Sequence, residues 1–262
     1  MAYVVVALVA FLASGLTMVS GFGLGTLLMP VFALFVPAEL AVAATALVHG
    51  ANNILKAVLL GRLAERSVVL RFGVPAIVAA MLGALALGAL SHLDPLVTYS
   101  LGARTATVTP VKIAMAVLMA GFALFDVHPC LAALQFDRAY LPLGALLSGF
   151  FGGLSGHQGA LRSAFLARTG LTPEGFVGTN AVIGLLVDLS RLSVYAALVG
   201  GGTLNALARP RDLWLVGVGA TAAFLGVLVA KPLLKKVTMR SVQRITAGML
   251  FLIALALGLG LV

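Results

Sequence analysis

Apolar runs of membrane-spanning length follow one another along almost the whole 262-residue chain. About 20 consecutive apolar residues cross the hydrocarbon core of a bilayer as a helix. Charged residues make up only 10% of the sequence, whereas a soluble domain has about 25%. The sequence therefore predicts an all-α polytopic membrane protein, a single membrane domain with no soluble domain. The expected helical segments are 3–20, 26–36, 40–60, 69–91, 107–125, 140–154, 160–168, 174–199, 213–231 and 242–262.

The net charge of +9 raises the question of an acidic partner. Cytoplasmic loops of membrane proteins collect Lys and Arg, so we expect no nucleic-acid partner. The single cysteine, Cys130, excludes an internal disulfide, and the scattered histidines offer no metal cluster. We expect no cofactor and no bound metal. The partners expected are a small solute, the lipid bilayer and protons, with the oligomeric state left open.

Two of the segments, 26–36 and 160–168, are too short to span a bilayer, and each follows a glycine-rich break. The breaks are SGFGLG at 20–25 and GGLSGHQG at 152–159. They belong to a repeat, because a gapless shift of 134 residues superimposes polar and glycine positions in the two halves. Repeats with interrupted helices at matching positions are typical of transporters, with the site at the interruptions. We therefore expect one repeat at 1–126 and a second at 127–262. The shift places Ser14 on Ser148, Gly15 on Gly149, Gly25 on Gly159, Thr45 on Thr179 and Gly50 on Gly184.

The loop charges favour a hairpin at each break. If 3–36 and 140–168 each cross the membrane once, Lys and Arg divide evenly between the two sides and give no orientation. If each is a re-entrant hairpin, most of them gather on one side. This predicts two inverted repeats, each a re-entrant or broken-helix hairpin plus three transmembrane helices. Both termini are then periplasmic, in a multi-pass protein of the bacterial inner (plasma) membrane. The cytoplasmic set is Arg62, Arg66, Arg71, Arg138, Arg168, Lys231, Lys235, Lys236 and Arg240, and the periplasmic set is Arg104, Arg209 and Arg211.

Polar residues within the first repeat form a stripe on one helix. His49, Asn52, Asn53 and Lys56 follow the spacing i, i+3, i+4, i+7. Interhelical hydrogen bonding is the structural explanation for such residues. A stripe that includes a lysine favours the lining of a cavity, because an ionisable side chain in the bilayer is costly.

The second repeat carries more charge. Asp188 and Arg191 are three residues apart on one helix face, and we expect a structural ion pair between them. Thr45 and Thr179 occupy equivalent positions in the repeat. Either they bond back to their own helices, or they act as a pair around the pseudo-twofold axis.

Arg162 stands near the start of the second half-helix, three residues after Gly159. Helix N-termini attract anions, so two half-helix starts that converge beside Arg162 and Lys56 would bind an anion with several acceptor oxygens. The alternative for Arg162 is snorkelling to the interface. The candidate substrate-binding residues are Gly21, Gly23, Gly25, Thr45, Asn52, Asn53, Lys56, Ser155, Gly156, His157, Gln158, Gly159, Arg162, Thr179 and Asn180.

The stretches 15–53 and 149–191 resemble the two halves of the TauE/SafE sulfite exporter family, also called the TSUP anion transporters. The family pattern is a Gly-rich run, then Pro, then a turn that ends in Ala-Thr or Gly-Thr. The resemblance implies secondary transport of a small anion such as sulfite or an organosulfonate like sulfoacetate, with export as the expected direction. The second copy departs from the pattern, because His157 and Gln158 interrupt its glycines and Ala164 stands where the first copy has Pro30. The matching positions are Gly21, Gly23, Gly25, Pro30, Pro37, Ala44 and Thr45, and then Gly152, Gly153, Gly156, Gly159, Thr172, Pro173, Gly178, Thr179 and Asn180.

Three functions compete. The first is an anion transporter, with His157 and His49 as candidates for coupling to protons. The second is an intramembrane serine protease, because Gly153-x-Ser155-Gly156 fits a nucleophile motif for which His49 could be the base. The third is an anion channel with the same site. We expect a transporter and no enzyme activity, because the repeat already explains the glycines around Ser155.

Overall fold

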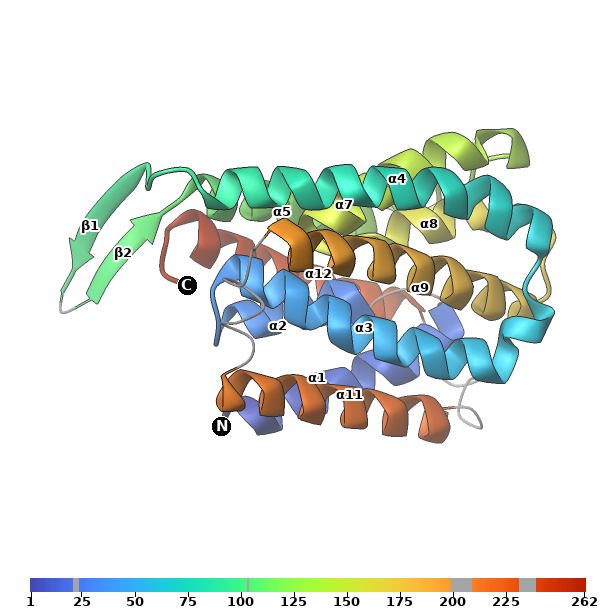
Figure 1. Ribbon diagram of the computed structural model, residues 1–262, viewed down its shortest axis with the longest axis horizontal. Coiled ribbons are helices and arrows are strands. Elements are labelled where there is room, and N and C mark those ends of the chain that lie inside the picture. Colours follow the sequence, from blue (N-terminus) through green and yellow to red (C-terminus); the bar gives the residue numbers. More distant parts are fainter. Residues whose placement is uncertain (21–23, 103, 199–208, 231–238) are drawn as a thin grey trace.

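The structure is a computed structural model, which describes the chain except for residues 21–23, 103, 199–208 and 231–238 (Figure 1). The described part is a bundle of helices with one small β-hairpin. Five of its helices are long and apolar enough to cross a membrane. The chain is therefore an all-α, multi-pass membrane protein, as the sequence predicts.

The first half of the chain begins with two helices that lie at a break and continues with three longer ones. Thr109 caps α5 by accepting a hydrogen bond from the Lys112 amide, and Pro110 occupies the first turn, where no amide hydrogen is needed. The elements are α1 (Ala2–Ser20), α2 (Leu24–Ala33), α3 (Ala38–Leu60), η1 (Gly61–Leu63), α4 (Arg66–Ser91), β1 (Val97–Leu101), β2 (Arg104–Val108) and α5 (Pro110–Val127).

The second half begins with two short elements and continues with a broken pair of helices and three longer helices. Prolines also begin its long helices α9 and α11, as expected for the first turn of a helix. The elements are α6 (Pro129–Ala132), η2 (Arg138–Tyr140), α7 (Leu141–Ser155), α8 (Gly159–Leu166), α9 (Pro173–Leu198), α11 (Pro210–Ala230) and α12 (Met239–Gly258).

Both helix breaks reverse the direction of the chain. The two termini lie at one end of the bundle, here called the terminal end (Figure 1). At this end the Tyr3 hydroxyl donates to the backbone carbonyl of Arg211. Residues Ala33–Glu39, at and after the end of α2, line a pocket together with Val262 at the same end. The chain therefore leaves α2 at the end where it entered α1. At the other end, here called the opposite end, Arg168 pairs with Asp137, so α7 and α8 also enter and leave together. Each break is therefore a hairpin.

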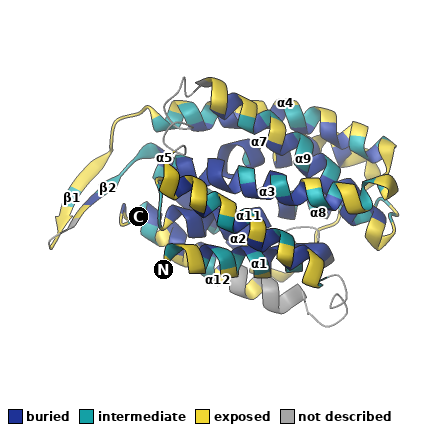
Figure 2. Ribbon diagram, turned by 60° about the horizontal axis from the view of Figure 1, so that its bottom comes forward, coloured by how far each residue is buried: buried dark blue, intermediate teal, exposed yellow. Residues whose placement is uncertain are grey.

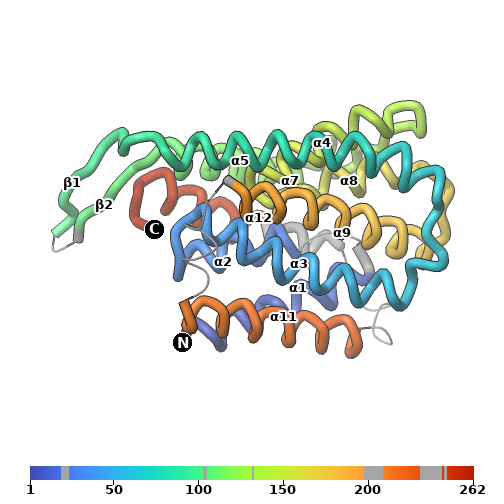
Figure 3. Tube along the Cα trace, viewed as in Figure 1, coloured from blue at the N-terminus to red at the C-terminus, as the bar shows by residue number. Residues whose placement is uncertain are grey.

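The hairpins pack on each other's halves. α1 lies along α11, where Gly15 faces Gly226 and Ala230, and α7 lies along α4, where Gly149 faces Ala76 (Figure 3). Glycine at these contacts lets the two backbones approach, as is common between helices in membranes. Each hairpin therefore packs against a helix of the other half of the chain. The division at residue 126 and the symmetry between the halves stay predictions.

The distribution of burial is that of a membrane protein. Large apolar side chains such as Leu12, Val78, Val117 and Leu252 are exposed on the outer helix surfaces, while the ionisable groups of the hairpins and their neighbours are buried (Figure 2). Lipid can solvate the outer surface, but buried charges need partners within the protein. The interior of the bundle is therefore where a solute site must be sought.

The sequence prediction missed the sheet. It placed a helix over 107–125, whereas residues up to Val108 belong to an antiparallel hairpin in which Val97 pairs with Val108. This hairpin projects from the terminal end (Figure 1). Its signal was present, because polar and apolar residues alternate on both sides of Gly102, which has a φ of 63° in the turn. The short elements α6 and η2 were also not predicted.

Candidate functional site

The tips of the two hairpins meet inside the bundle. A Cβ atom at Gly25, in the first turn of α2, would lie 3.0 Å from the carbonyl oxygen of Gly156. Gly156 ends α7 with a φ of 80°, a left-handed conformation that favours glycine. The same Gly25 position lies 3.8 Å from the His49 ring on α3. The half-helix starts that the sequence singled out are therefore close together, and a polar stripe of α3 flanks them.

Asp188 on α9 is the centre of a buried hydrogen-bond network. Its Oδ2 lies 2.6 Å from Nδ1 of His49 and accepts a bond of 3.1 Å from the side-chain amide of Asn53. Its Oδ1 accepts bonds from the guanidinium of Arg191, with Nη2 at 2.7 Å, and from the Gln158 amide at 3.1 Å. The pair of Asp188 and Arg191 thus forms, but the same carboxylate also joins α3 and the second hairpin.

Arg162 extends this network along α8. Its guanidinium donates to the side-chain oxygens of Gln158 and Asn180, at 2.9 Å for the first. The side chain is buried, so it does not snorkel toward the interface. A Cβ atom at Gly184 would lie 2.6 Å from the Asn53 amide nitrogen and 3.3 Å from Arg162 Nη2, which shows how closely α9 packs against these groups.

The remaining stripe residues of α3 contact the first hairpin and α11. Asn52 bonds to the Ser14 hydroxyl at 2.9 Å, and that hydroxyl lies 2.6 Å from the carbonyl oxygen of Ala223. Lys56 donates to the Thr17 hydroxyl. Lys56 is also buried. Interhelical hydrogen bonding therefore accounts for the Oδ1 atom of Asn52, whereas its Nδ2 atom has no partner among the described residues. Lys56 adds a buried amino group beside the first hairpin.

His157 and Ser155 lie at the second tip. The His157 ring stacks on Phe122 of α5, with centroids 5.4 Å apart, and its Nδ1 lies 3.0 Å from the Ser155 carbonyl oxygen and 3.2 Å from the Ser155 hydroxyl. The Ser155 hydroxyl donates to the Phe151 carbonyl, one turn earlier. A nucleophilic serine needs to donate to a histidine nitrogen, and here the proton points elsewhere. The partner ring is also His157, whereas the protease hypothesis needs His49.

Some predicted residues lie away from this network. Thr179 accepts a hydrogen bond from the Glu65 amide near the opposite end, so it does not pair with Thr45. The Thr45 hydroxyl is buried and has no hydrogen-bond partner among the described residues. Gly159 begins α8, within the second tip. Gly21 and Gly23 lie outside the described residues.

Three residues near the network were not predicted from the sequence. Tyr195 donates its hydroxyl hydrogen to the Gly153 carbonyl, and its position four residues after Arg191 could have indicated a shared face. Phe122 carries no polar signal and is found only through its stack on His157. Asp126, on the next turn of the same buried face of α5, has a carboxylate oxygen with no partner in the described part of the chain.

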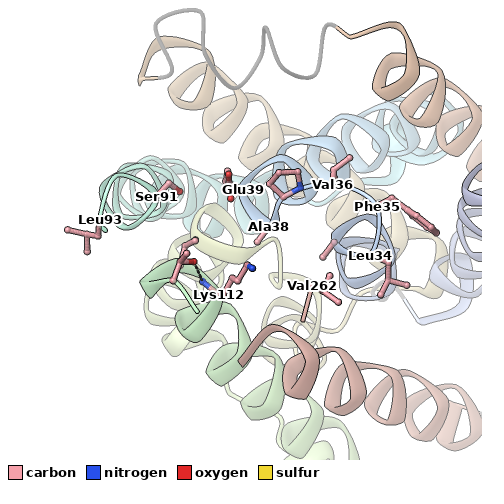
Figure 4. A pocket seen from close by; sticks show the side chains of 13 residues that line it. Leu34, Phe35, Val36, Ala38, Glu39, Ser91, Leu93, Lys112 and Val262 are labelled. Atoms are coloured by element: carbon pink, nitrogen blue, oxygen red, sulfur yellow. Dashed lines mark hydrogen bonds between the residues drawn. The ribbon is translucent and has the colours of Figure 1, made fainter. Parts of the chain in front are cut away.

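A pocket of about 440 Å³ opens at the terminal end, where α2 ends and where α3 and α5 begin (Figure 4). Glu39 and Lys112 line it and carry opposite charges. The same three helices carry Gly25, His49 and Phe122 farther along their length. The pocket therefore lies in line with the hairpin tips, separated from His49 by ten residues of α3, or roughly 15 Å.

The charge of the buried cluster is unbalanced. Two buried arginines, Arg162 and Arg191, share this network with one carboxylate, that of Asp188. Uncompensated buried charge is strongly unfavourable, so an anion between the tips would complete the balance. In the described ranges, no group of three or more His, Cys, Asp or Glu side chains could hold a metal ion. The arrangement can bind an anion through cationic groups, amides and the half-helix starts.

Comparison with protein families identifies the chain. The model of the sulfite exporter TauE/SafE family matches residues 6–257. The chain belongs to the TauE/SafE family. It is accordingly a membrane transporter of the sulfite and anion exporter type. Comparison with curated proteins and comparison with solved structures give no match.

Proposed function

We propose that this TauE/SafE protein is a secondary transporter that exports a small sulfur-containing anion, such as sulfite or sulfoacetate. The excess of buried positive charge at the two hairpin tips carries this proposal. Arg162 supplies a planar array of donors, and the starts of α2 and α8 add the positive ends of two helices. An anion with three oxygens in a sulfite or sulfonate group suits such a set of donors.

The route of the anion is inferred from the pocket at the terminal end. Lys112 and Glu39 line this pocket, and the helices that form it continue to the tips. The α3–α9 contact at the opposite end is tight, because a Cβ atom at Gly178 would overlap the Leu60 carbonyl. We infer a site that is approached from the terminal end in this conformation. Movement of the hairpins against α3 and α9 would open the other side.

Coupling to protons is part of the proposal. Of the two candidate histidines, His49 is held by Asp188, whereas Nε2 of His157 is buried without a partner among the described residues. His157 is therefore the better candidate for a group that takes part in proton movement.

Flux measurements in proteoliposomes test the proposed function. Purified protein should accelerate the release of labelled sulfite or sulfoacetate, with saturation by substrate and exchange of label against unlabelled anion on the other side. Exchange distinguishes a carrier from the channel alternative, which would give neither saturation at low concentration nor accelerated exchange. Fluorophosphonate labelling of Ser155 would favour the protease alternative, and we expect none.

A further inference from the structure

Nε2 of His157 is a buried ring nitrogen without a hydrogen-bond partner among the described residues. We propose that the site binds its anion in a form that carries one acidic O–H hydrogen, and that Nε2 of His157 accepts this hydrogen. The proposal rests on the proposed function, since it concerns the same site. It adds a rule of substrate choice: an oxyanion with an acidic O–H, such as bisulfite, is preferred to an anion of similar shape without one.

The two contacts of Nδ1 determine which nitrogen of the His157 ring carries the hydrogen. The Ser155 carbonyl oxygen can only accept, so the Nδ1 atom 3.0 Å away must carry a hydrogen. The Ser155 hydroxyl gives its own hydrogen to Phe151, and its oxygen is then an acceptor toward Nδ1 as well. Both contacts therefore assign the hydrogen of the neutral ring to Nδ1. Nε2 then presents a lone pair.

Contacts of the His157 ring fix its plane, and so fix the direction of the Nε2 lone pair. His157 is 1% exposed, and its Nε2 has no hydrogen-bond partner in the described ranges. The ring is parallel to Phe122 within 9°, so its plane is set by α5 on one side and by Ser155 at Nδ1. A buried acceptor without a partner costs free energy, and a ligand that supplies a donor removes that cost.

The charged groups around the tip have a different role. Arg191 of α9 reaches the tip, where its Nη1 lies 3.4 Å from the Cβ position of Gly156 and donates to the Gly152 carbonyl at 2.8 Å. Asp188 holds the other side of that guanidinium. Arg162 lies on α8, Gly25 faces the tip from α2, and Asp126 lies one turn beyond Phe122 on α5. The arginines attract any anion, whereas Nε2 distinguishes anions that have a hydrogen to donate.

We expect strong discrimination between anions with and without an acidic O–H hydrogen. A site that contains a buried polar group for a substrate hydrogen rejects an analogue without that hydrogen, because the group stays unpaired. No covalent bond is made or broken when the anion binds to Nε2. The hydrogen stays shared between an anion oxygen and Nε2, so one proton crosses with each anion.

Two variants separate the lone pair from the structural contact. In His157→Asn, the side-chain amide can still donate near the Nδ1 position, but nothing replaces Nε2. In His157→Gln, an amide oxygen can reach the Nε2 position and accept a hydrogen. The anions are sulfite, measured across the pH range where bisulfite loses its proton, and methanesulfonate, which has no acidic O–H.

The experiment is flux of each anion into proteoliposomes, with the internal pH followed by a trapped dye. For the wild type we expect faster transport of bisulfite than of methanesulfonate, a decline as bisulfite deprotonates, and internal acidification. The His157→Asn variant should lose roughly tenfold or more of its bisulfite flux while methanesulfonate flux is retained. The His157→Gln variant should keep part of the preference.

Three outcomes overturn the proposal. The first is a wild-type sulfite flux that does not change as bisulfite deprotonates. The second is a His157→Asn variant that keeps the wild-type preference. The third is an equal loss of both anions in this variant, which would show that His157 only supports the fold. A wild-type protein that moves neither anion is a separate result, because it rejects the proposed transport itself and the inference with it.

Discussion

Gly25 and Gly156 bring the tips of two helical hairpins into contact, with only 3.0 Å between the Cβ position of the first and the carbonyl oxygen of the second. The two residues are far apart in the sequence and belong to different halves of the chain. Their contact places the start of α2 beside the end of α7, next to His49 and the carboxylate of Asp188. Any anion that binds at one tip is therefore within the field of the other.

Gly25→Val tests the contact between the tips. The Cβ atom of valine would lie 3.0 Å from the Gly156 carbonyl oxygen and its two methyl groups need further space, so the tips must move apart. We therefore expect destabilisation by about 1–3 kcal/mol and a loss of flux of at least roughly tenfold. Gly121→Val is the control, because nothing lies within 4 Å of that Cβ position on α5. Melting temperature in detergent and flux in proteoliposomes are measured for both. Equal melting temperatures and equal fluxes in the two variants would contradict the role given to Gly25.

Asp188→Asn tests the central carboxylate. The change leaves Arg191 buried and without its counter-charge, and the loss of one partner of a buried pair costs about 3–5 kcal/mol. The matched control is Asp137→Asn, whose carboxylate is 71% exposed in its pair with Arg168 and should contribute about 1 kcal/mol at most. Thermal unfolding of the purified proteins compares them. A stable Asp188→Asn protein would show that other groups balance the arginines.

Arg162→Lys tests the shape of the cationic group. Lysine keeps the charge, but it cannot donate to both Gln158 and Asn180 as the guanidinium does. We expect the protein to fold and its KM for the anion to rise roughly tenfold, the loss of one charge-assisted hydrogen bond. Arg168→Lys at the exposed opposite end should leave KM unchanged. An unchanged KM in Arg162→Lys would remove Arg162 from the binding site.

Cys130 offers a direct test of orientation. It is free and exposed, and it lies between α5 and α7 at the opposite end, which the charge bias assigns to the cytoplasm. A membrane-impermeant maleimide applied outside intact spheroplasts should not label Cys130 until the membrane is permeabilised. In a Cys130→Ser protein, Ser100→Cys on the exposed β1 strand should be labelled from outside. The reverse pattern would place both termini in the cytoplasm.

Much of the framework follows from local patterns. The apolar runs predict the helices closely, so the expected segment 140–154 corresponds to α7 at Leu141–Ser155. Helical spacing predicts that His49 and Asn53 share a face, and they do share the Asp188 oxygen. The spacing of Asp188 and Arg191 predicts their pairing. The glycine-rich breaks and the loop charges predict hairpins, because backbone freedom and charge asymmetry are local properties of the chain.

The tertiary structure decided which of these faces meet. Asp188 is not a closed pair with Arg191, because packing of α3 against α9 brings His49 and Asn53 onto the same carboxylate. Thr45 and Thr179 match in the repeat, yet Thr179 bonds to Glu65 near one end. Phe122 has no sequence signal and still orients His157. Periodicity determines which residues share a helix face, whereas close packing at small residues such as Gly25 and Gly184 determines which face lies opposite.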